Sequence, residues 1–337
     1  MKSREIRLKK RPEGLPSLDN FELAEVELPA PGPGEMLIRN VVTSVDPYLR
    51  GRMSDRDSYA PPFKLGAAIE GRAVGEVVAS NGGSFTPGTY VIHRLGWRDY
   101  ALSGGAGLTE VDPKLAPLSA YLGTLGASGL TAYVGLLHIA EAKMGETVFV
   151  SAAAGAVGTV VCQIAKAIGC TVIGSAGSQE KVDWLLAEAG CDHAINYKTA
   201  GDLTEALAAA APNGIDVYFE NVGGEHLVAA LNSLKPFGRV AVCGMIGTYN
   251  ATTPQPGPWN LFHMIPKRLT IKGFALFDHD DLIPQFMKDM SRWIADGKLK
   301  LYETVVDGLE KAPDAFIGIF KGENIGKMIV RIGPDKS

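Results

Sequence analysis

Residues 146–169, with the sequence ETVFVSAAAGAVGTVVCQIAKAIG, restrict the possible fold more than any other stretch. Residues 146–152 are rich in β-branched and aromatic side chains, and from Ala156 onward apolar side chains follow at helical spacing up to Gly169. A membrane-spanning helix is disfavoured, because glycines and polar residues interrupt the apolar run. The pattern therefore predicts a buried strand, a glycine turn and a helix.

The predicted turn has the form A-x-G-x-x-G, from Ala153, Gly155 and Gly158. This form is a variant of the dinucleotide-binding fingerprint, with alanine in place of the first glycine. The small first residue lets the chain turn, Gly155 lets the backbone approach a pyrophosphate, and Gly158 lets the helix pack closely on the strand. Exposed N–H groups at the start of the helix can then bind phosphate. Glycines that serve packing alone are the alternative for such a turn taken by itself.

Strands and helices continue to alternate after this turn. The predicted strands are residues 171–176, 193–197, 215–224 and 238–247. The predicted helices between them are residues 178–190, 202–211 and 226–234. The alternation predicts an α/β fold with a Rossmann doubly wound parallel sheet, whose ligands bind at the carboxyl ends of the strands.

The end of the second predicted strand bears on which dinucleotide is bound. An NAD site places an acidic residue there, about 20 residues after the glycines, to bind the ribose hydroxyls. This chain has GSAGSQEK instead, with no carboxylate closing the strand. Ser178 can cap the next helix, and Lys181 then lies in its first turn, where the helix dipole disfavours a cation. From these residues alone, a surface lysine and a ligand of the 2′-phosphate of NADP are equally good interpretations of Lys181.

The sequence before the alternating region is of a different kind. Short β-rich segments broken by proline and glycine predict a compact antiparallel, barrel-like domain, and they include residues 27–40, 71–81 and 85–93. The final predicted strand, GKMIVRI, is assigned to the same domain. We therefore expect a β-rich domain of residues 1–125 and 298–337, and a dinucleotide-binding domain of residues 126–297.

Composition excludes several classes of partner. The net charge of −4 gives no basic surface for nucleic acid or anionic lipid, and the hydrophobic share of 46% is typical of a soluble globular protein. The four cysteines and six histidines have no zinc-ligand spacing, so we expect no metal site. No signal-peptide pattern occurs at the N-terminus, and we expect a cytoplasmic protein with free thiols and no membrane segment.

The segments AAAGAVG, AGSQEKVDWL, NYKT, FENVGG, CGMIGTYN and NIGKMIV follow one another in this order. With this order over essentially the whole chain, the sequence resembles the zinc-independent medium-chain dehydrogenase/reductase superfamily. Within it, the match is similar to the group of leukotriene dehydrogenase/prostaglandin reductases, alkenal double-bond reductases and curcumin-type reductases. The segment VDPYLRGRM strengthens the resemblance, because zinc alcohol dehydrogenases of the superfamily carry a cysteine ligand in the corresponding segment. The resemblance implies an NADP-binding Rossmann domain, a GroES-like substrate domain and a homodimer.

The resemblance also implies which residues bind NADPH. Those implied to face the pyrophosphate are Gly155, Ala156, Val157 and Gly158. Those implied to hold the 2′-phosphate are Lys181 and Tyr197, which favours the phosphate role of Lys181. Those implied to line the ribose and nicotinamide are Asn221, Cys243, Gly244, Met245, Ile246, Gly247, Thr248, Tyr249, Phe274, Ala275, Leu276 and Asn324. The group often has a branched residue where Ala275 stands, so the floor of the pocket departs from the pattern.

The implied reaction is NADPH-dependent reduction of the carbon–carbon double bond of an enone or enal, a small-molecule substrate. Hydride adds to the β-carbon when the carbonyl oxygen is polarised, and a neutral phenol of pKa about 10 can donate a hydrogen bond there. Tyr249 is the candidate catalytic residue, with a packed loop tyrosine as the alternative, and either Tyr249 or water can protonate the α-carbon. Tyr48, Tyr59 and Phe63 are candidates for an apolar substrate pocket or for ordinary packing. A quinone oxidoreductase and a non-catalytic NADPH-binding sensor are the alternative functions.

Overall fold

The computed structural model describes residues 1–56 and 58–336 of the 337-residue chain. Contacts divide the chain into two compact units. The first unit comprises Met1–Gly123, Glu303–Asn324 and Met328–Ser337. The second comprises Thr124–Tyr302 and Ile325–Lys327. Both units are therefore built from segments that are distant in the sequence.

The second unit contains a six-stranded sheet in which all pairings are parallel. Its order is β10 (His193–Asn196), β9 (Thr171–Ala176), β8 (Thr147–Val150), β11 (Ile215–Glu220), β12 (Leu234–Val242) and β13 (Thr270–Gly273). The chain proceeds outward from β8 to β10 and then from β11 to β13, so the order reverses between β8 and β11. The predicted doubly wound parallel sheet is thus confirmed.

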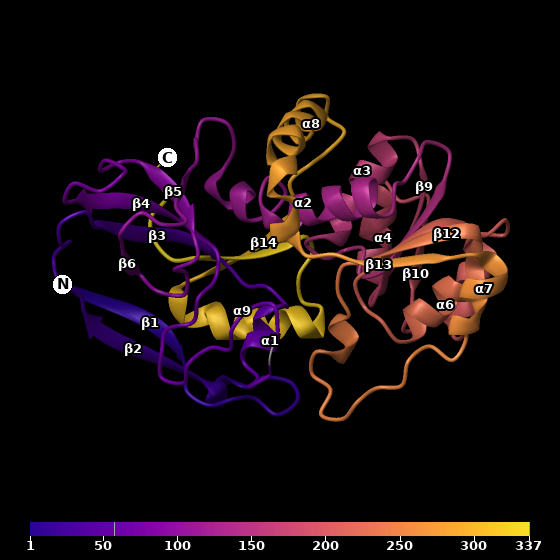
Figure 1. The fold of residues 1–337 in the computed structure, drawn as a ribbon, viewed down its shortest axis with the longest axis horizontal. Coiled ribbons are helices and arrows are strands. Elements are labelled where there is room, and N and C mark those ends of the chain that lie inside the picture. Colours follow the sequence, from indigo (N-terminus) through magenta and orange to yellow (C-terminus); the bar gives the residue numbers. More distant parts are fainter. Residues whose placement is uncertain (57, 337) are drawn as a thin grey trace. The chain divides into compact units, whose positions relative to one another are not determined.

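Strand β13 was not predicted from the sequence. Three of its four residues are exposed, and it lies at the edge of the sheet beside β12, as Figure 1 shows. An edge strand with few buried side chains carries neither apolar alternation nor a continuous apolar run. The strand β8, by contrast, is buried along its last three residues and follows the predicted pattern.

Helices connect the strands of the second unit. They are α2 (Ala127–Tyr133), the π-helical turn η3 (Val134–Ile139), α3 (Gly158–Ala167), α4 (Gln179–Ala187), α5 (Leu203–Ala210), α6 (Glu225–Ser233), α7 (Met264–Lys267) and α8 (Ile283–Ala295). One hydrophobic cluster joins β8, β9 and β11 to helices α5 and α6, with Phe149, Leu207, Tyr218 and Leu231 at or below 1% exposure. Burial of each such side chain contributes about 1.5–3 kcal/mol to folding. This cluster stabilises the sheet from which the loops of the site extend.

The first unit contains antiparallel sheet. Its strands are β1 (Lys2–Leu8), β2 (Phe21–Glu27), β3 (Met36–Ser44), β4 (Ala73–Ser80), β5 (Tyr90–His93), β6 (Tyr100–Ser103), β7 (Thr109–Glu110), β14 (Glu303–Asp307) and β15 (Lys327–Arg331). β1 pairs with β2, whereas β3 pairs antiparallel with β4, β6 and the C-terminal strand β15. The pairing of β3 with β15 joins the two ends of the chain in one sheet.

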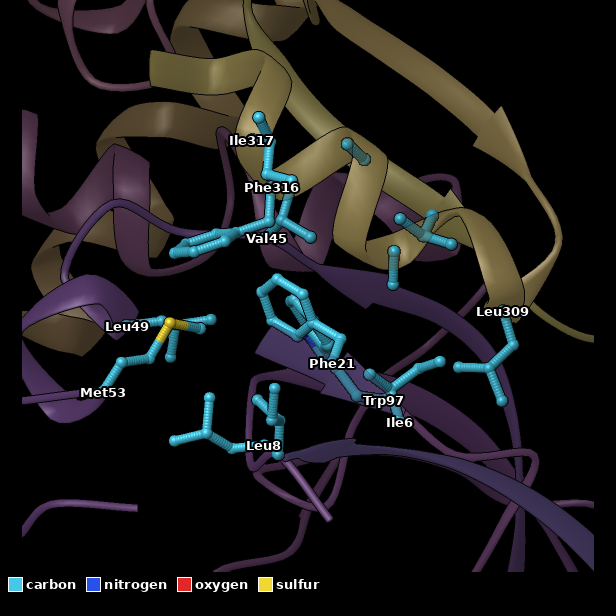
Figure 2. Packing of buried hydrophobic residues seen from close by; sticks show 14 of the residues in the cluster. Ile6, Leu8, Phe21, Val45, Leu49, Met53, Trp97, Leu309, Phe316 and Ile317 are labelled. Carbon is cyan, nitrogen blue, oxygen red and sulfur yellow. The ribbon is translucent and has the colours of Figure 1, made fainter. Parts of the chain in front are cut away.

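Figure 2 shows the aromatic core of the first unit. Phe21, Trp97 and Phe316 contact one another, with ring centroids 5.9–6.3 Å apart. Phe316 comes from α9 (Ala312–Lys321), and Leu49 of the short helix α1 (Leu49–Arg52) lies in the same cluster. The C-terminal segment is therefore part of the hydrophobic core of the N-terminal sheet.

No helix within residues 1–56 and 58–336 is both long enough and apolar enough to cross a membrane.

Candidate functional site

The glycine turn between β8 and α3 requires residues without side chains. A Cβ atom on Gly158 would lie 2.3 Å from the carbonyl oxygen of Ala152 and 2.7 Å from the Cα of Ala153. Only glycine therefore lets α3 begin so close to the end of β8. The N–H of Gly155 donates to the carbonyl of Ala152 over 2.9 Å, which closes the turn.

The start of α3 leaves backbone donors available. Val157 at the N-cap position provides no side-chain hydrogen bond. The N–H of Val157 donates to no acceptor in the described part of the chain, whereas the N–H of Ala156 faces Gly326 through the isolated parallel bridge between Gly155 and Gly326. Gly155, Ala156 and Val157 are partly exposed, whereas Ala154 and Gly158 on either side are buried. A donor such as that of Val157, at the positive end of a helix dipole, fits a bound phosphate group.

A second set of residues lies at the end of β9. A Cβ atom on Gly177 would lie 2.8 Å from the hydroxyl of Tyr197 and 3.2 Å from the Cε of Lys198. Ser178 caps α4 as predicted, because its hydroxyl accepts a hydrogen bond from the N–H of Lys181. Tyr197, Lys198 and Lys181 therefore surround the short segment between β9 and α4. Neither lysine ammonium forms an ion pair within the residues that the structure describes.

The charge at this position is unbalanced. Burial lowers the pKa of Lys181 below its usual value, the positive charge of Lys198 lowers it further, and only Glu180 opposes these effects. Two cations and a phenol around a glycine, with no carboxylate at the strand end, fit a dianionic phosphate better than a pair of ribose hydroxyls. Lys198 was not identified from the sequence, although it follows Tyr197 directly.

A buried carboxylate lies at the end of β11. Glu220 is fully buried, and its Oε1 accepts hydrogen bonds from the Tyr218 hydroxyl (2.7 Å), the Ser151 hydroxyl (3.2 Å) and the N–H groups of Val222 (2.6 Å) and Gly223 (2.8 Å). Burial raises the pKa of Glu220, while the donated hydrogen bonds act in the opposite direction. The sequence prediction missed Glu220, for which the local signal was a charged residue directly after three apolar residues of the strand.

Hydrogen bonds join the loop after β11 to the loop after β12. The carbonyls of Asn221 and Val222 accept from the N–H groups of Ile246 and Gly247, each over 3.0 Å. The Asn221 side-chain amide donates to the backbone carbonyl of Ser151 over 2.8 Å, so its N–H₂ group already has a partner. Glu220 therefore binds both loops. Its carboxylate accepts hydrogen bonds from the first loop, and its backbone carbonyl accepts hydrogen bonds from the second.

The predicted nicotinamide segment 243–249 forms this second loop. The N–H of Met245 donates to the Tyr249 hydroxyl over 3.3 Å, so the phenol folds back over its own loop. Burial, and then the charge of Glu220, raise the pKa of the Cys243 thiol to about 12. The thiol is therefore protonated and unreactive near neutral pH.

Residues 274–276 follow β13 and begin the segment η6 (Leu276–Leu282). They are partly exposed. The Phe274 ring packs so closely on η3 that a Cβ atom on Gly135 would lie 2.7 Å from it. The second unit thus carries the predicted residues of the turn, of the Lys181 and Tyr197 pair, and of the loops that follow β11, β12 and β13.

Four predicted residues belong to the first unit: Tyr48, Tyr59, Phe63 and Asn324. Phe63 is 5% exposed and packs in the hydrophobic cluster under the Arg52 guanidinium, which lies 4.1 Å from its ring centroid. Burial raises the pKa of Tyr48 to about 12. Asn324 is buried, whereas Tyr59 is 69% exposed. Of the two roles that the sequence left open for Phe63, a substrate pocket or ordinary packing, its environment fits ordinary packing.

Metal-binding groups do not gather in the described residues. No group of three or more histidine, cysteine, aspartate or glutamate side chains there is arranged to hold a metal ion. All four cysteines are free thiols.

Comparison with known families gives two matches. Residues 4–111 match the family described as the N-terminal domain of oxidoreductase, and residues 156–295 match the family described as zinc-binding dehydrogenase.

Individual relatives match nearly the whole chain. The chain is 42% identical to the NADPH-dependent curcumin reductase of Escherichia coli, over 97% of this chain and 96% of that protein. It is 43% identical to the 2-alkenal reductase (NADP(+)-dependent) of Nicotiana tabacum, over 98% and 97%. The solved structure of CurA from Vibrio vulnificus in complex with NADPH superposes with a TM-score of 0.93 at 44% identity, covering 98% of this chain and all of that one.

Proposed function

We propose that this chain, which belongs to the zinc-independent medium-chain dehydrogenase/reductase family and to its group of prostaglandin, alkenal and curcumin reductases, is an NADPH-dependent double-bond reductase. It reduces the carbon–carbon double bond of small α,β-unsaturated ketones and aldehydes, by hydride transfer to the β-carbon and protonation of the α-carbon. The observation that carries the cofactor choice is the pair of unpaired lysines beside Tyr197 at the end of β9, where an NAD site would have a carboxylate.

The proposed cofactor site follows the carboxyl ends of the strands. The backbone of Gly155–Gly158 binds the pyrophosphate, which the N–H group of Val157 supports because it lacks an acceptor in the described residues. Lys181 and Tyr197 bind the 2′-phosphate, and Lys198 adds a second cation. The ribose and nicotinamide are lined by Asn221, by residues 243–249, by residues 274–276 and by Asn324.

NADPH, when bound, supplies the hydride. The protein polarises the substrate, because negative charge develops on the carbonyl oxygen as the β-carbon accepts hydride. Tyr249 is the proposed donor to that oxygen, because it lies on the loop after β12 and its hydroxyl, which accepts from the N–H of Met245, also carries a proton that a phenol can donate. Tyr249 or water then protonates the α-carbon. Tyr48 and Tyr59 provide aromatic surface for the rest of the substrate. Phe63 instead packs in the hydrophobic core of the first unit.

We also propose a homodimer formed through the edge of the six-stranded sheet. Strand β13 ends the sheet, and an unpaired strand edge is a template for pairing with a second copy. Large apolar side chains are exposed on the neighbouring strand β12 and in the segment of chain before β13: Phe237, Trp259, Phe262 and Ile265 are each more than half exposed. Light scattering of the wild type and of Ile265→Asp tests this, since the variant should be monomeric.

A cytoplasmic location accompanies the proposal, because four free cysteines suit a reducing compartment. A substrate panel tests the function. NADPH oxidation should be rapid with enals and enones and slow with simple quinones, and the product should be the saturated carbonyl compound. Preferential turnover of quinones would favour the quinone oxidoreductase alternative, and binding of NADPH without turnover of any panel member would favour a sensor.

A further inference from the structure

Four aromatic rings form a continuous series through the second unit. Tyr218 stacks on Phe149, with ring centroids 5.1 Å apart and planes 17° apart. Phe149 stacks on His226, with centroids 6.5 Å and planes 9° apart. His226 meets Tyr197 edge to face, with centroids 4.9 Å and planes 73° apart. The series therefore extends from the tyrosine that donates to Glu220 to the tyrosine beside Lys198.

His226 acts in this series as a ring rather than as a hydrogen-bonding group. It is 4% exposed, and its Nε2 atom has no hydrogen-bond partner among the described residues. Burial lowers its pKa to about 4, so the imidazole is neutral near pH 7. A buried histidine with an unpaired nitrogen costs free energy, which aromatic contacts on two sides offset only in part. Packing in the core alone would be served better by an apolar side chain.

Tyr197 contacts His226 at the end of this series. Tyr197 is 38% exposed, and no hydrogen bond to its hydroxyl is present within the described residues. The hydroxyl nevertheless lies directly over Gly177, where a Cβ atom would approach it to 2.8 Å. His226 is the only aromatic ring in contact with Tyr197 in the described part of the chain. Among the described residues, the edge-to-face contact with His226 is thus the ring contact that can orient the phenol over the turn.

We propose that His226 is a positioning residue for cofactor selection: it fixes Tyr197 beside the 2′-phosphate and so increases the preference for NADPH over NADH. The role rests on the proposed use of NADPH. His226 belongs to α6, and it reaches the phosphate end of the site only through Tyr197, so it does not contact the reacting atoms.

The test compares three forms of the full-length protein. His226→Leu replaces the ring with an aliphatic side chain, whereas His226→Phe keeps a ring but has no nitrogen. In steady-state assays with one enone, His226→Leu should raise the KM for NADPH about two- to tenfold. The KM for NADH and the kcat at saturating cofactor should stay within about twofold, because the loss is confined to the phosphate end. His226→Phe should recover most of the NADPH preference.

A matched control separates this role from a general loss of stability. His93 is equally buried at 3% exposure, also has an unpartnered Nε2, and lies in the first unit. His93→Leu should leave the ratio of the two KM values unchanged, whatever it does to the melting temperature. Equal effects of His226→Leu and His93→Leu on that ratio would overturn the proposal, and so would a failure of His226→Phe to recover it.

The outcomes also distinguish this role from the proposed function. A wild type that prefers NADH contradicts the proposed cofactor, and the role of His226 falls with it. A wild type that prefers NADPH by the same factor as His226→Leu overturns the role of His226 alone.

Discussion

Removing the two lysines beside Tyr197 should change cofactor choice by different amounts, because the lysines differ in burial. Lys181 is half-buried in the first turn of α4, and burial lowers the pKa of its ammonium group. Lys198 is exposed, but its side chain lies against the same glycine as the Tyr197 hydroxyl. We therefore expect Lys181→Ala to be the more damaging of the two substitutions.

The magnitudes follow from the environment of each charge. A hydrogen bond between a charged, partly buried donor and phosphate contributes about 1.5–3 kcal/mol, which corresponds to a roughly ten- to hundredfold rise in the KM for NADPH. An exposed ion pair contributes about 0.2–1 kcal/mol, so Lys198→Ala should raise the KM about fivefold at most. Salt should weaken the Lys198 contribution more strongly, since exposed charges are screened.

Steady-state kinetics with NADPH and NADH, at low and high salt, measure these effects on both single variants and the double variant. The KM for NADH should stay within about twofold in every variant, because NADH lacks the phosphate. The kcat at saturating cofactor should be preserved, since the lost contacts are at the adenosine end. Equal losses for both cofactors would refute the phosphate assignment, and a larger effect of Lys198 than of Lys181 would refute the argument from burial.

Three further changes have expected outcomes. Tyr249→Phe should lower kcat about a hundredfold, because one hydrogen-bond donor to a developing negative charge contributes about 3 kcal/mol. The KM for NADPH should stay within twofold. Activity within twofold of the wild type would remove Tyr249 from the mechanism. Gly158→Ala should destabilise the protein by about 1–3 kcal/mol in a thermal melt, because the added Cβ would overlap backbone atoms. The control Gly257→Ala should have the melting temperature of the wild type, because no atom lies within 4 Å of a Cβ at that position. His93 and His226 have pKa values lowered to about 4 from 6.5, so the unfolded chain takes up their protons first as pH falls. Their contribution to stability is full above about pH 6.5 and is lost towards pH 4, by up to about 3 kcal/mol each. Urea unfolding at pH 7 and at pH 4.5 measures this loss. An equal or higher midpoint urea concentration at pH 4.5 would contradict the expectation.

The parts of the fold that were predicted from the sequence are those with local causes. Strand β8, the turn and helix α3 occupy one continuous segment, in which buried β-branched residues, glycines and helical spacing follow one another. The capping of α4 by Ser178 is equally local. Strand β13 has no such local signal, because its pairing with β12 is made by backbone groups while most of its side chains remain exposed.

The same distinction applies to the candidate site. Gly158 could be identified because its requirement for close approach arises within one turn. The role of Glu220 could not be predicted from its charge alone, because its hydroxyl donor Ser151 is 69 residues away in the sequence and becomes its neighbour only when β8 pairs with β11. The contact of His226 with Tyr197 likewise depends on the packing of α6 against the sheet. Interactions between elements require the fold before they can be recognised.

The central claim, hydride transfer from NADPH to the β-carbon of an enone, is tested most directly by isotope transfer. The protein would be incubated with NADPH deuterated at the transferring position of C4 and an enone, and the product analysed by NMR and mass spectrometry. The account predicts a saturated ketone with one deuterium on the carbon β to the carbonyl and a solvent-derived hydrogen on the α-carbon. Deuterium on the carbinol carbon of an allylic alcohol, or a saturated ketone without deuterium at the β-position from either C4 diastereomer of the cofactor, would contradict it.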